Sequence, residues 1–332
     1  MPVPPRLVRR LLVLPIVVAL ELLLLLLSPV ALLVAALLSP LFGGLRPLRF
    51  ALIVVLFAAR HLEAVLACVG LWVRSGFGAR MGSPELQRAH IAVMRRFVAG
   101  VYRAIVRLAR VEVVTHETPE ALEALRGGGR PVVLLSRHAG EGDTLLVIYE
   151  LLCRHDRAPR VVMHQALRLD PLIDMLGGRL PNRFVDPRGG DTEVEIAAMA
   201  SELDDSGALV IFPEGANFTE ERRARGIARL EEAGHEEEAA WAREMHHVSA
   251  PRPGGALAAI DASPGADVVV MGHVGFPDGL GEVWRHLPEK QVIEVMLWHE
   301  PADTIPAGHD ERIDWLFGVW RRLDTWVAER AG

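Results

Sequence analysis

The feature that most restricts the fold is the long apolar stretch near the start of the chain. No residue from Leu22 to Leu45 is charged, and residues 11–20 are also apolar, with Glu21 as the interruption between them. A helix needs about 20 apolar residues to cross the hydrocarbon core of a bilayer. The stretch is too long for the apolar part of a signal peptide, and no small-residue cleavage site stands out. We therefore expect a membrane anchor that is retained.

A second apolar stretch covers residues 50–73 and is interrupted by Arg60, His61 and Glu63. Charges at membrane depth are costly unless they are paired, and Arg60 and Glu63 are three residues apart, so they can meet on one helical face. A tight helical hairpin and a helix lying partly in the interface are both compatible with this pattern. A core helix of a soluble protein is a third alternative for this stretch, but it fits the first stretch poorly.

Charge divides the chain into a basic leader and an acidic body. Residues 1–75 carry seven arginines and two acids, a balance of +5, whereas the net charge of the 332 residues is −6, which leaves −11 for the remainder. We expect membrane-anchoring helices over residues 1–80 and a separate domain over residues 81–332. The acidic body argues against nucleic-acid binding. The two cysteines, Cys68 and Cys153, exclude a disulfide scaffold.

Short apolar runs alternate with helix-like segments in the body of the chain. This alternation predicts an α/β domain with a mixed sheet flanked by helices. The charged segment 220–247 predicts an exposed helix or helical pair, and the apolar residues of 91–108 recur at helical spacing, with arginines elsewhere on that helix. The clearest other helices are expected near 143–153, 191–204 and 309–329, and strands are expected at 111–114, 132–135, 160–163, 184–185, 208–212, 267–271 and 292–297.

The segment PVVLLSRHAGEGDTLL places a histidine and an aspartate just after a buried-looking strand. In one continuous helix the five residues from His138 to Asp143 would turn through about 500°, so the pair would not share a face. Gly140 and Gly142 lie between them and permit a tight turn that folds the carboxylate back to the imidazole. A histidine held in this way suits a general base. A helix-capping Asp143 beside a surface histidine is the alternative that the spacing leaves open.

Two further segments carry candidate site residues. In ALVIFPEGANFT a strand runs into Pro213, which ends the ladder, and Glu214 is then displayed at the carboxyl end, where open α/β sheets build their sites. A solvated glutamate in a plain turn is the competing explanation. The segment GGRLPNRFVDPRGGD places Arg179, Arg183 and Arg188 around a short strand. Arginines bind phosphate oxygens in a bidentate manner, although a solvated basic face also accounts for them.

Taken in order, these segments resemble the glycerophospholipid acyltransferase family, which includes the 1-acylglycerol-3-phosphate acyltransferases. The resemblance covers residues 130–275 and rests on His-x4-Asp, an Arg-bearing Phe-Val-Asp segment, Phe-Pro-Glu-Gly and a later Pro-Arg-x-Gly-Gly. It implies that His138 is the catalytic base, that Asp143 is its partner, and that Glu214 and Gly215 belong to the motif that binds the acyl acceptor. It also implies that an arginine of the middle motif contacts phosphate.

The chain departs from the family pattern at three places. Pro187 displaces Arg188 by one position, so Arg183 and Arg188 are rival phosphate contacts. Ala216 and Asn217 follow Phe-Pro-Glu-Gly where the family commonly has Thr-Arg, and the late strand VVVMGHVGF carries a histidine and no proline. These departures affect the motifs associated with phosphate and acceptor binding, so the resemblance does not define which lysophospholipid is the acyl acceptor.

The resemblance implies a membrane-bound enzyme of phospholipid biosynthesis. It would move a fatty acyl group from acyl-CoA or acyl carrier protein to a lysophospholipid such as 1-acylglycerol-3-phosphate. No resident cofactor or metal is expected, because a thioester is already activated. The location expected is a bacterial inner membrane with the catalytic domain in the cytoplasm, since arginines on both sides of each span favour cytoplasmic ends. Two alternatives remain: a membrane-bound hydrolase that uses His138, Asp143 and Glu141 around a metal or water, and an inactive lipid-binding scaffold.

Overall fold

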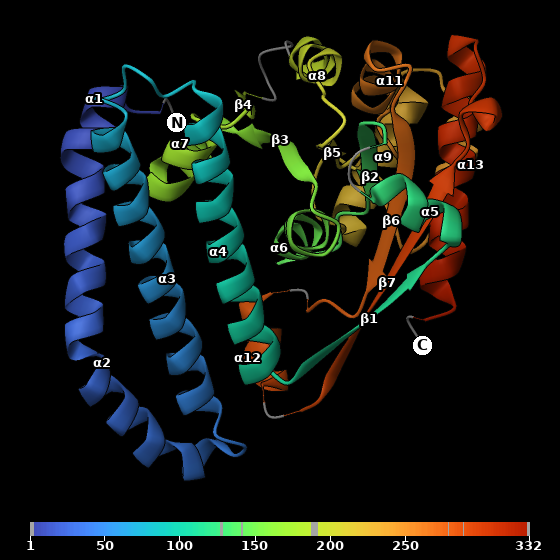
Figure 1. Ribbon diagram of the computed structural model, residues 1–332. Coiled ribbons are helices and arrows are strands. Elements are labelled where there is room, and N and C mark those ends of the chain that lie inside the picture. Colours follow the sequence, from blue (N-terminus) through green and yellow to red (C-terminus); the bar gives the residue numbers. More distant parts are fainter. Residues whose placement is uncertain are drawn as a thin grey trace. The chain divides into compact units, whose positions relative to one another are not determined.

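The computed structural model describes residues 3–126, 129–140, 142–186, 192–277, 279–287 and 289–330 (Figure 1). Contacts divide the chain into two compact units. The first unit contains residues 1–112, 160–191 and 281–291, and the second contains residues 113–159, 192–280 and 292–332. The expected boundary between residues 80 and 81 stays a prediction.

The first unit begins with a helical hairpin. A continuous helical segment is formed by α1 (Arg6–Val8), the π-helical turn η1 (Arg9–Val13) and α2 (Leu14–Phe42), and α3 (Arg46–Arg74) follows it. The connection is tight because Gly43, Gly44 and Leu45 all adopt positive φ. Of the alternatives for the second apolar stretch, the structure therefore has the tight hairpin. Residues 6–42 and 46–74 form helices that are long and apolar enough to cross a membrane.

Within the hairpin, Arg60 and Glu63 are paired as their spacing predicts. Arg60 Nη1 lies 2.7 Å from Glu63 Oε2 on the same helix. In addition, His61 Nδ1 lies 2.5 Å from Glu21 Oε1 on α2, and its Nε2 lies 3.3 Å from Asp170 Oδ1. Polar groups that would be costly at membrane depth are thus matched with one another.

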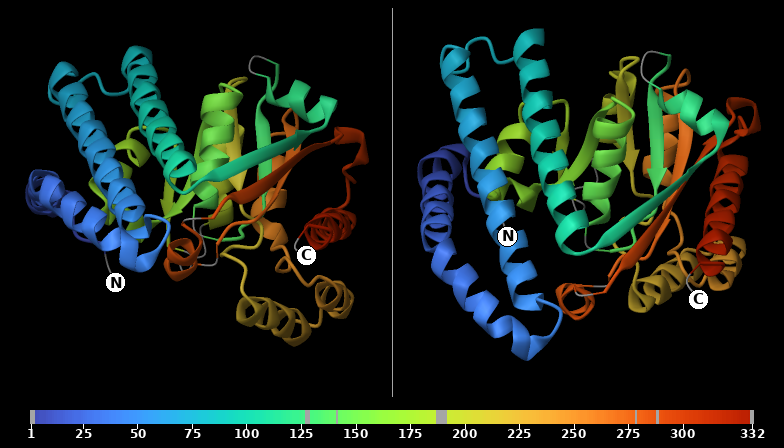
Figure 2. Two further views of the ribbon diagram at one scale, coloured as in Figure 1. Left: turned by 90° about the horizontal axis from the view of Figure 1, so that it is seen from below. Right: turned by 60° about the horizontal axis from the view of Figure 1, so that its bottom comes forward.

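The basic helix predicted over residues 91–108 is the later part of α4 (Pro84–Leu108), which runs beside α3 (Figures 1 and 2). Its residues Ile91, Met94 and Phe97 pack against a core formed by α3 and α7 (Pro171–Gly177). The apolar face of this helix is therefore occupied by protein contacts. Also in this unit are the 3-10 turn η3 (Gln165–Leu169) and α12 (Leu280–His286).

The strands form one seven-stranded sheet in the order β1-β7-β6-β2-β5-β3-β4. It is a mixed sheet, because β2 is parallel to both β5 and β6 whereas β7 is antiparallel to β6. Each of the seven predicted runs corresponds to a strand, which confirms the predicted fold class. The strands are β1 (Val111–Glu117), β2 (Val132–Ser136), β3 (Ala158–His164), β4 (Arg183–Val185), β5 (Gly207–Ile211), β6 (Asp267–Val274) and β7 (Gln291–Glu300).

The central strand β2 decides where a site can form. All residues of β2 and of β5 are buried, which explains why both read as unbroken apolar runs. Leu135 pairs with Ile211 on β5, and Ser136 pairs with Met271 on β6. The carboxyl ends of β2 and β5 therefore reach the same edge of the sheet, and β6 continues beside them.

Helices of the second unit flank this sheet. The charged segment forms a helical pair, α9 (Glu220–Glu232) and α10 (Glu236–Glu244), coloured gold-brown in Figure 2. Trp241 of α10 packs on Phe317 of α13 with ring centroids 5.6 Å apart. The remaining elements are α5 (Pro119–Leu125), α6 (Asp143–Tyr149), the π-helical turn η2 (Glu150–Arg154), α8 (Thr192–Ser201), α11 (Pro253–Ala262), the 3-10 turn η4 (Ala302–Thr304) and α13 (His309–Ala328).

Candidate functional site

The ends of the two neighbouring strands β2 and β5 bring the first candidate residues together. The backbone N–H of Arg137 still donates to the carbonyl of Met271, 3.0 Å away, so the ladder extends one residue past β2 and places His138 at the edge. Glu214 follows β5 after Phe212 and Pro213. The rings of His138 and Phe212 lie against each other, with centroids 4.6 Å apart. The histidine is thus held at the carboxyl edge of the sheet, with 22% of its side chain exposed.

His138 and Asp143 are in direct contact, as the glycine-containing turn between them predicts. The distance from His138 Nδ1 to Asp143 Oδ2 is 2.8 Å. Gly142 makes the turn with a φ of +96°, a conformation that glycine adopts without strain. Gly142 also occupies the N-cap of α6, so Asp143 is the first residue of this helix and not its cap. Without the cap role, its carboxylate is available to the imidazole.

The Asp143 carboxylate is buried and well supplied with donors. Its Oδ2 also accepts the backbone N–H groups of Ala139 (2.9 Å) and Gly140 (3.3 Å). Burial by itself would raise the pKa of Asp143, but the hydrogen bond and charge of His138 outweigh it and hold that pKa below its usual value. An ionised carboxylate can only accept hydrogen bonds, so Nδ1 of His138 carries a proton, and in the neutral imidazole Nε2 is then the nitrogen with the free lone pair. Among the described residues, none makes a hydrogen bond to Nε2.

Glu214 connects two backbone segments of the site. Its Oε1 accepts the backbone N–H of His138 and its Oε2 accepts that of Ser249, each at 2.9 Å. Burial raises the pKa of Glu214 to about 7, even though both hydrogen bonds favour the charged form. The carboxylate therefore fixes the main chain of His138 in place.

Two buried residues of the site, Arg137 and His273, were not among the candidates. Arg137 donates from Nη1 to the carbonyl of His273 (2.5 Å) and from Nη2 to that of His247 (2.7 Å). His273 Nε2 donates in turn to the carbonyl of Arg137, 3.0 Å away. Burial lowers the pKa of His273 to about 4, so this imidazole is neutral. The pairing of β2 with β6 is what reveals His273. Because Ser136 pairs with Met271, the residues two positions further on, His138 and His273, also lie opposite each other.

The Phe-Pro-Glu-Gly and Pro-Arg-x-Gly-Gly segments lie side by side. The backbone N–H of Arg252 donates to the carbonyl of Pro213 at 2.8 Å. Gly215 has a φ of +73°, and a Cβ at this position would lie 3.0 Å from the Arg252 guanidinium. A glycine at position 215 therefore permits both the positive φ of the turn and the close approach of the Arg252 side chain.

The three arginines of the middle segment are placed differently. Arg179 and Arg183 belong to the first unit, whereas His138 belongs to the second. Arg179 Nη1 donates to the carbonyl of Cys68 (2.7 Å) and lies 3.1 Å from His90 Nε2. Arg183 is half-buried at the start of β4. Arg188 lies outside the described residues, as does Glu141 of the hydrolase alternative.

One group of described side chains has the spacing of metal ligands, and it is separate from His138. Glu117, Glu150 and His155 place their ligand atoms within 4.8 Å of one another. Arg154 already contacts both carboxylates, at 2.5 Å from Glu150 Oε2 and 3.3 Å from Glu117 Oε2. The charge of this group is therefore largely compensated within the protein.

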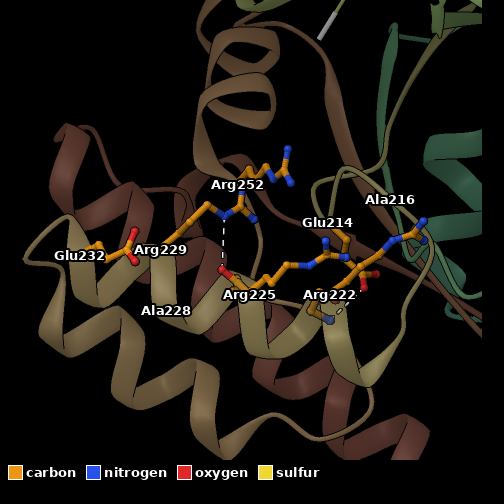
Figure 3. Close-up of a pocket in the computed structure, with 11 residues that line it drawn as sticks. Glu214, Ala216, Arg222, Arg225, Ala228, Arg229, Glu232 and Arg252 are labelled. Atoms are coloured by element: carbon orange, nitrogen blue, oxygen red, sulfur yellow. Dashed lines mark hydrogen bonds between the residues drawn. The ribbon is translucent and has the colours of Figure 1, made fainter. Parts of the chain in front are cut away.

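A cavity of about 480 Å³ adjoins Glu214 (Figure 3). Glu214, Ser249 and Arg252 contribute to its wall, together with one face of α9. Glu214 connects the cavity to His138, because its side chain both lines the cavity and accepts the backbone N–H of His138. The sequence had indicated only an exposed charged helix at this position.

Comparison with known proteins agrees with these observations. Residues 110–274 match the family model described as Acyltransferase. This span begins next to β1, ends with β6, and contains His138, Asp143, Glu214 and His273. The search of curated proteins found no match. Through residues 110–274 the chain therefore belongs to the glycerophospholipid acyltransferase family.

Proposed function

We propose that the protein is a membrane-bound acyltransferase that transfers a fatty acyl group from a thioester to the hydroxyl of a lysophospholipid. An acceptor such as 1-acylglycerol-3-phosphate and a donor such as acyl-CoA or acyl carrier protein fit this chemistry. The observation that carries the proposal is the 2.8 Å contact between His138 Nδ1 and Asp143 Oδ2, which leaves Nε2 as the base. Family membership supports acyl transfer as the type of reaction.

The proposed reaction needs no nucleophile from the enzyme. His138 Nε2 takes the proton of the acceptor hydroxyl as that oxygen attacks the thioester carbonyl. Asp143 holds the ring orientation and stabilises the imidazolium that forms, as the carboxylate does in a Ser-His-Asp triad. The C–S bond then breaks, and the imidazolium returns the proton to the leaving thiolate. The products are the acylated phospholipid and a free thiol.

The two apolar helices support a membrane location for this reaction. Both the acceptor and the product are lipids, so an enzyme anchored in the bilayer meets them where they reside. We place the catalytic domain on the cytoplasmic side of a bacterial inner membrane, because arginines flank both apolar stretches. This location is part of the proposal.

The test is replacement of the proposed base. His138→Ala is expected to lower acceptor-dependent thiol release by at least about 100-fold, the lower end of the usual contribution of a general base. His309→Ala is the matched control, because His309 is exposed at the start of α13. Thiol release is measured with purified protein, one labelled acyl thioester and a panel of lysophospholipids, with products identified by mass spectrometry. Full turnover by His138→Ala would refute the assignment of the base.

The same assay separates the alternatives. Release of free fatty acid without an acceptor would favour the hydrolase, and lipid binding without turnover of any thioester would favour the scaffold. An acylated acceptor formed by the wild-type chain but not by His138→Ala is the outcome that the transferase proposal requires.

A further inference from the structure

The cavity beside Glu214 presents one face of α9 that is rich in arginine. Arg222, Arg225 and Arg229 all line it, and their spacing of three and four residues puts them on the same face of the helix. Seven residues of α-helix extend over about 10 Å. Between them Gly226 also lines the cavity, and a Cβ at Gly226 would meet nothing within 4 Å. The face is therefore a row of cations beside open space.

A fourth arginine faces this row from another segment. Arg252, just before α11, lines the same cavity and lies above Arg229 in Figure 3. Partial burial lowers the pKa of Arg252, and the charge of Arg229 lowers it further. Two cations are thus held close enough to repel each other, which is unfavourable unless an anion joins them.

The protein itself supplies little negative charge to this row. Within the described part of the chain, Arg229 and Arg252 form no ion pair, and Arg225 has only Glu221 at 3.7 Å on the exposed side of the helix. Arg222 donates to the carbonyl of Asn217 at 2.9 Å. Two acids also contribute to the cavity wall. Glu214 is occupied by two backbone N–H groups, and Glu232, three residues after Arg229, forms no ion pair among the described residues.

We propose that this cavity, which we call the arginine pocket, binds phosphate groups of a substrate of the acyl transfer proposed above, on which the inference rests. Arginine guanidinium groups pair with phosphate oxygens through parallel N–H···O bonds. Three of them along about 10 Å of helix, with Arg252 facing them from another segment, suit several phosphates better than one. The arginine pocket therefore fits the nucleotide end of coenzyme A better than the single phosphate of a lysophospholipid.

Direct binding tests this proposal without requiring turnover. The probes are free coenzyme A and 1-acylglycerol 3-phosphate, each titrated into the full chain in detergent at low salt and followed by thermophoresis. The pocket variant combines Arg225→Ala with Arg229→Ala. The control combines Arg130→Ala with Arg321→Ala, two exposed arginines of the second unit that do not line the cavity.

The pocket variant is expected to bind coenzyme A at least about tenfold more weakly than the wild type, whereas the control binds like the wild type. Raising the salt concentration should weaken wild-type binding more than binding by the pocket variant, since the arginines are exposed to screening. A loss confined to 1-acylglycerol 3-phosphate would also support a phosphate pocket, but it would assign the pocket to the acceptor. Equal affinities for the pocket variant and the control, or no binding of either probe by the wild type, would overturn the proposal.

Failure of the proposed function gives a different result. A wild-type chain that turns over no thioester would refute acyl transfer, yet the tenfold difference in probe binding would still be measurable. Conversely, normal turnover and unchanged substrate affinities in the pocket variant would refute the arginine pocket and leave the function of His138 intact.

Discussion

The carboxylate of Asp143 acts on both the ring and the backbone around His138. Its Oδ2 accepts from the imidazole and also from the N–H groups of Ala139 and Gly140, so it fixes the turn as well as the ring. A neutral amide at this position keeps the size of the side chain but brings a donor group. Replacing Asp143 with asparagine therefore removes its control of the His138 ring and its stabilisation of the imidazolium charge, with little change in side-chain volume.

Asp143→Asn is expected to lower kcat by about 100-fold or more, because the imidazolium loses its anionic partner and the protonation of Nδ1 is no longer enforced. KM for the acceptor should change much less, since no contact of Asp143 with the acceptor is part of the proposal. Steady-state kinetics with varied acceptor concentrations separate the two constants. A rise in KM at unchanged kcat would contradict the positioning role of Asp143.

His273 makes the stability of the protein sensitive to acid. Its pKa is about 4 in the fold against 6.5 for an ordinary histidine, because the imidazole is buried and the positive charge of Arg137 further disfavours its protonation. Between these pH values the unfolded chain binds more protons, so this residue contributes stability that is lost as the pH falls from 6.5 to 4. Glu214 has the opposite effect, since its raised pKa makes stability fall as the pH rises from 4.5 to about 7.

Because these two effects overlap, only a comparison with a variant isolates His273. His273→Gln keeps a donor to the Arg137 carbonyl but does not titrate. Its cost in unfolding free energy is expected to shrink by up to about 3 kcal/mol as the pH falls from 7 to 4, from a pKa difference of about 2.5 units. Denaturant unfolding in detergent at both pH values measures this, with exposed His309→Gln as the control. A cost that is independent of pH would contradict a buried neutral imidazole.

At the scale of elements, glycine has opposite effects on stability in the turn after β5 and in the helix α9. Gly215 has a φ of +73° and lies against the Arg252 guanidinium, whereas Gly226 is inside α9 with open space around it. Gly215→Ala is expected to destabilise the protein by about 1–2 kcal/mol through backbone strain. Gly226→Ala should stabilise it by up to about 1 kcal/mol, because alanine is the better helix former.

Thermal unfolding of the two variants beside the wild type tests this pair. Opposite shifts in Tm are expected, and the Gly226 variant also serves as a control for the general effect of adding a methyl group. Two downward shifts of similar size would show that the positive φ of Gly215 is not the cause of its cost.

The strands could be predicted from the sequence because their burial is continuous. Every residue of β2 and β5 is buried, so these strands read as apolar runs bounded by polar turns. The contact between His138 and Asp143 could be predicted as one of two alternatives, since Gly140 and Gly142 permit the tight turn that it needs. These are local features, decided by residues close together in the chain.

The arginine pocket and the role of His273 could not be predicted in the same way. Arg252 comes to the cavity from a segment separated from Arg229 by the whole of α10, and only the folded chain shows which face of α9 it meets. The spacing of Arg222, Arg225 and Arg229 was visible in the sequence, but a solvated helix has the same pattern. Predicting the position of His273 would have required the register between β2 and β6, which apolar runs alone do not define.

On the scale of the whole chain, the outer surface of α2 is the strongest indication of a bilayer. Leu26, Leu37 and Leu41 expose 75%, 69% and 78% of their surface, so these apolar side chains of the helix are not covered by the described protein. An aqueous location would leave this large apolar surface in water, at a cost of about 25 cal/mol per Å². Insertion into lipid removes that cost without any partner protein.

The full chain is therefore expected to stay in the membrane fraction after an alkaline carbonate wash and to be released by detergent. Leu26→Arg should reduce the retained fraction, because an arginine at the centre of a span costs about 2.5–3.5 kcal/mol on insertion scales. Leu167→Arg is the matched control, since Leu167 is an exposed leucine of η3 outside both apolar helices. Immunoblots of the two fractions, with a tag at the carboxyl terminus, give the ratio. Release of the wild-type chain by carbonate, or equal ratios for the two variants, would show that α2 is not inserted, and a shortened membrane-free product would identify it as a cleaved leader.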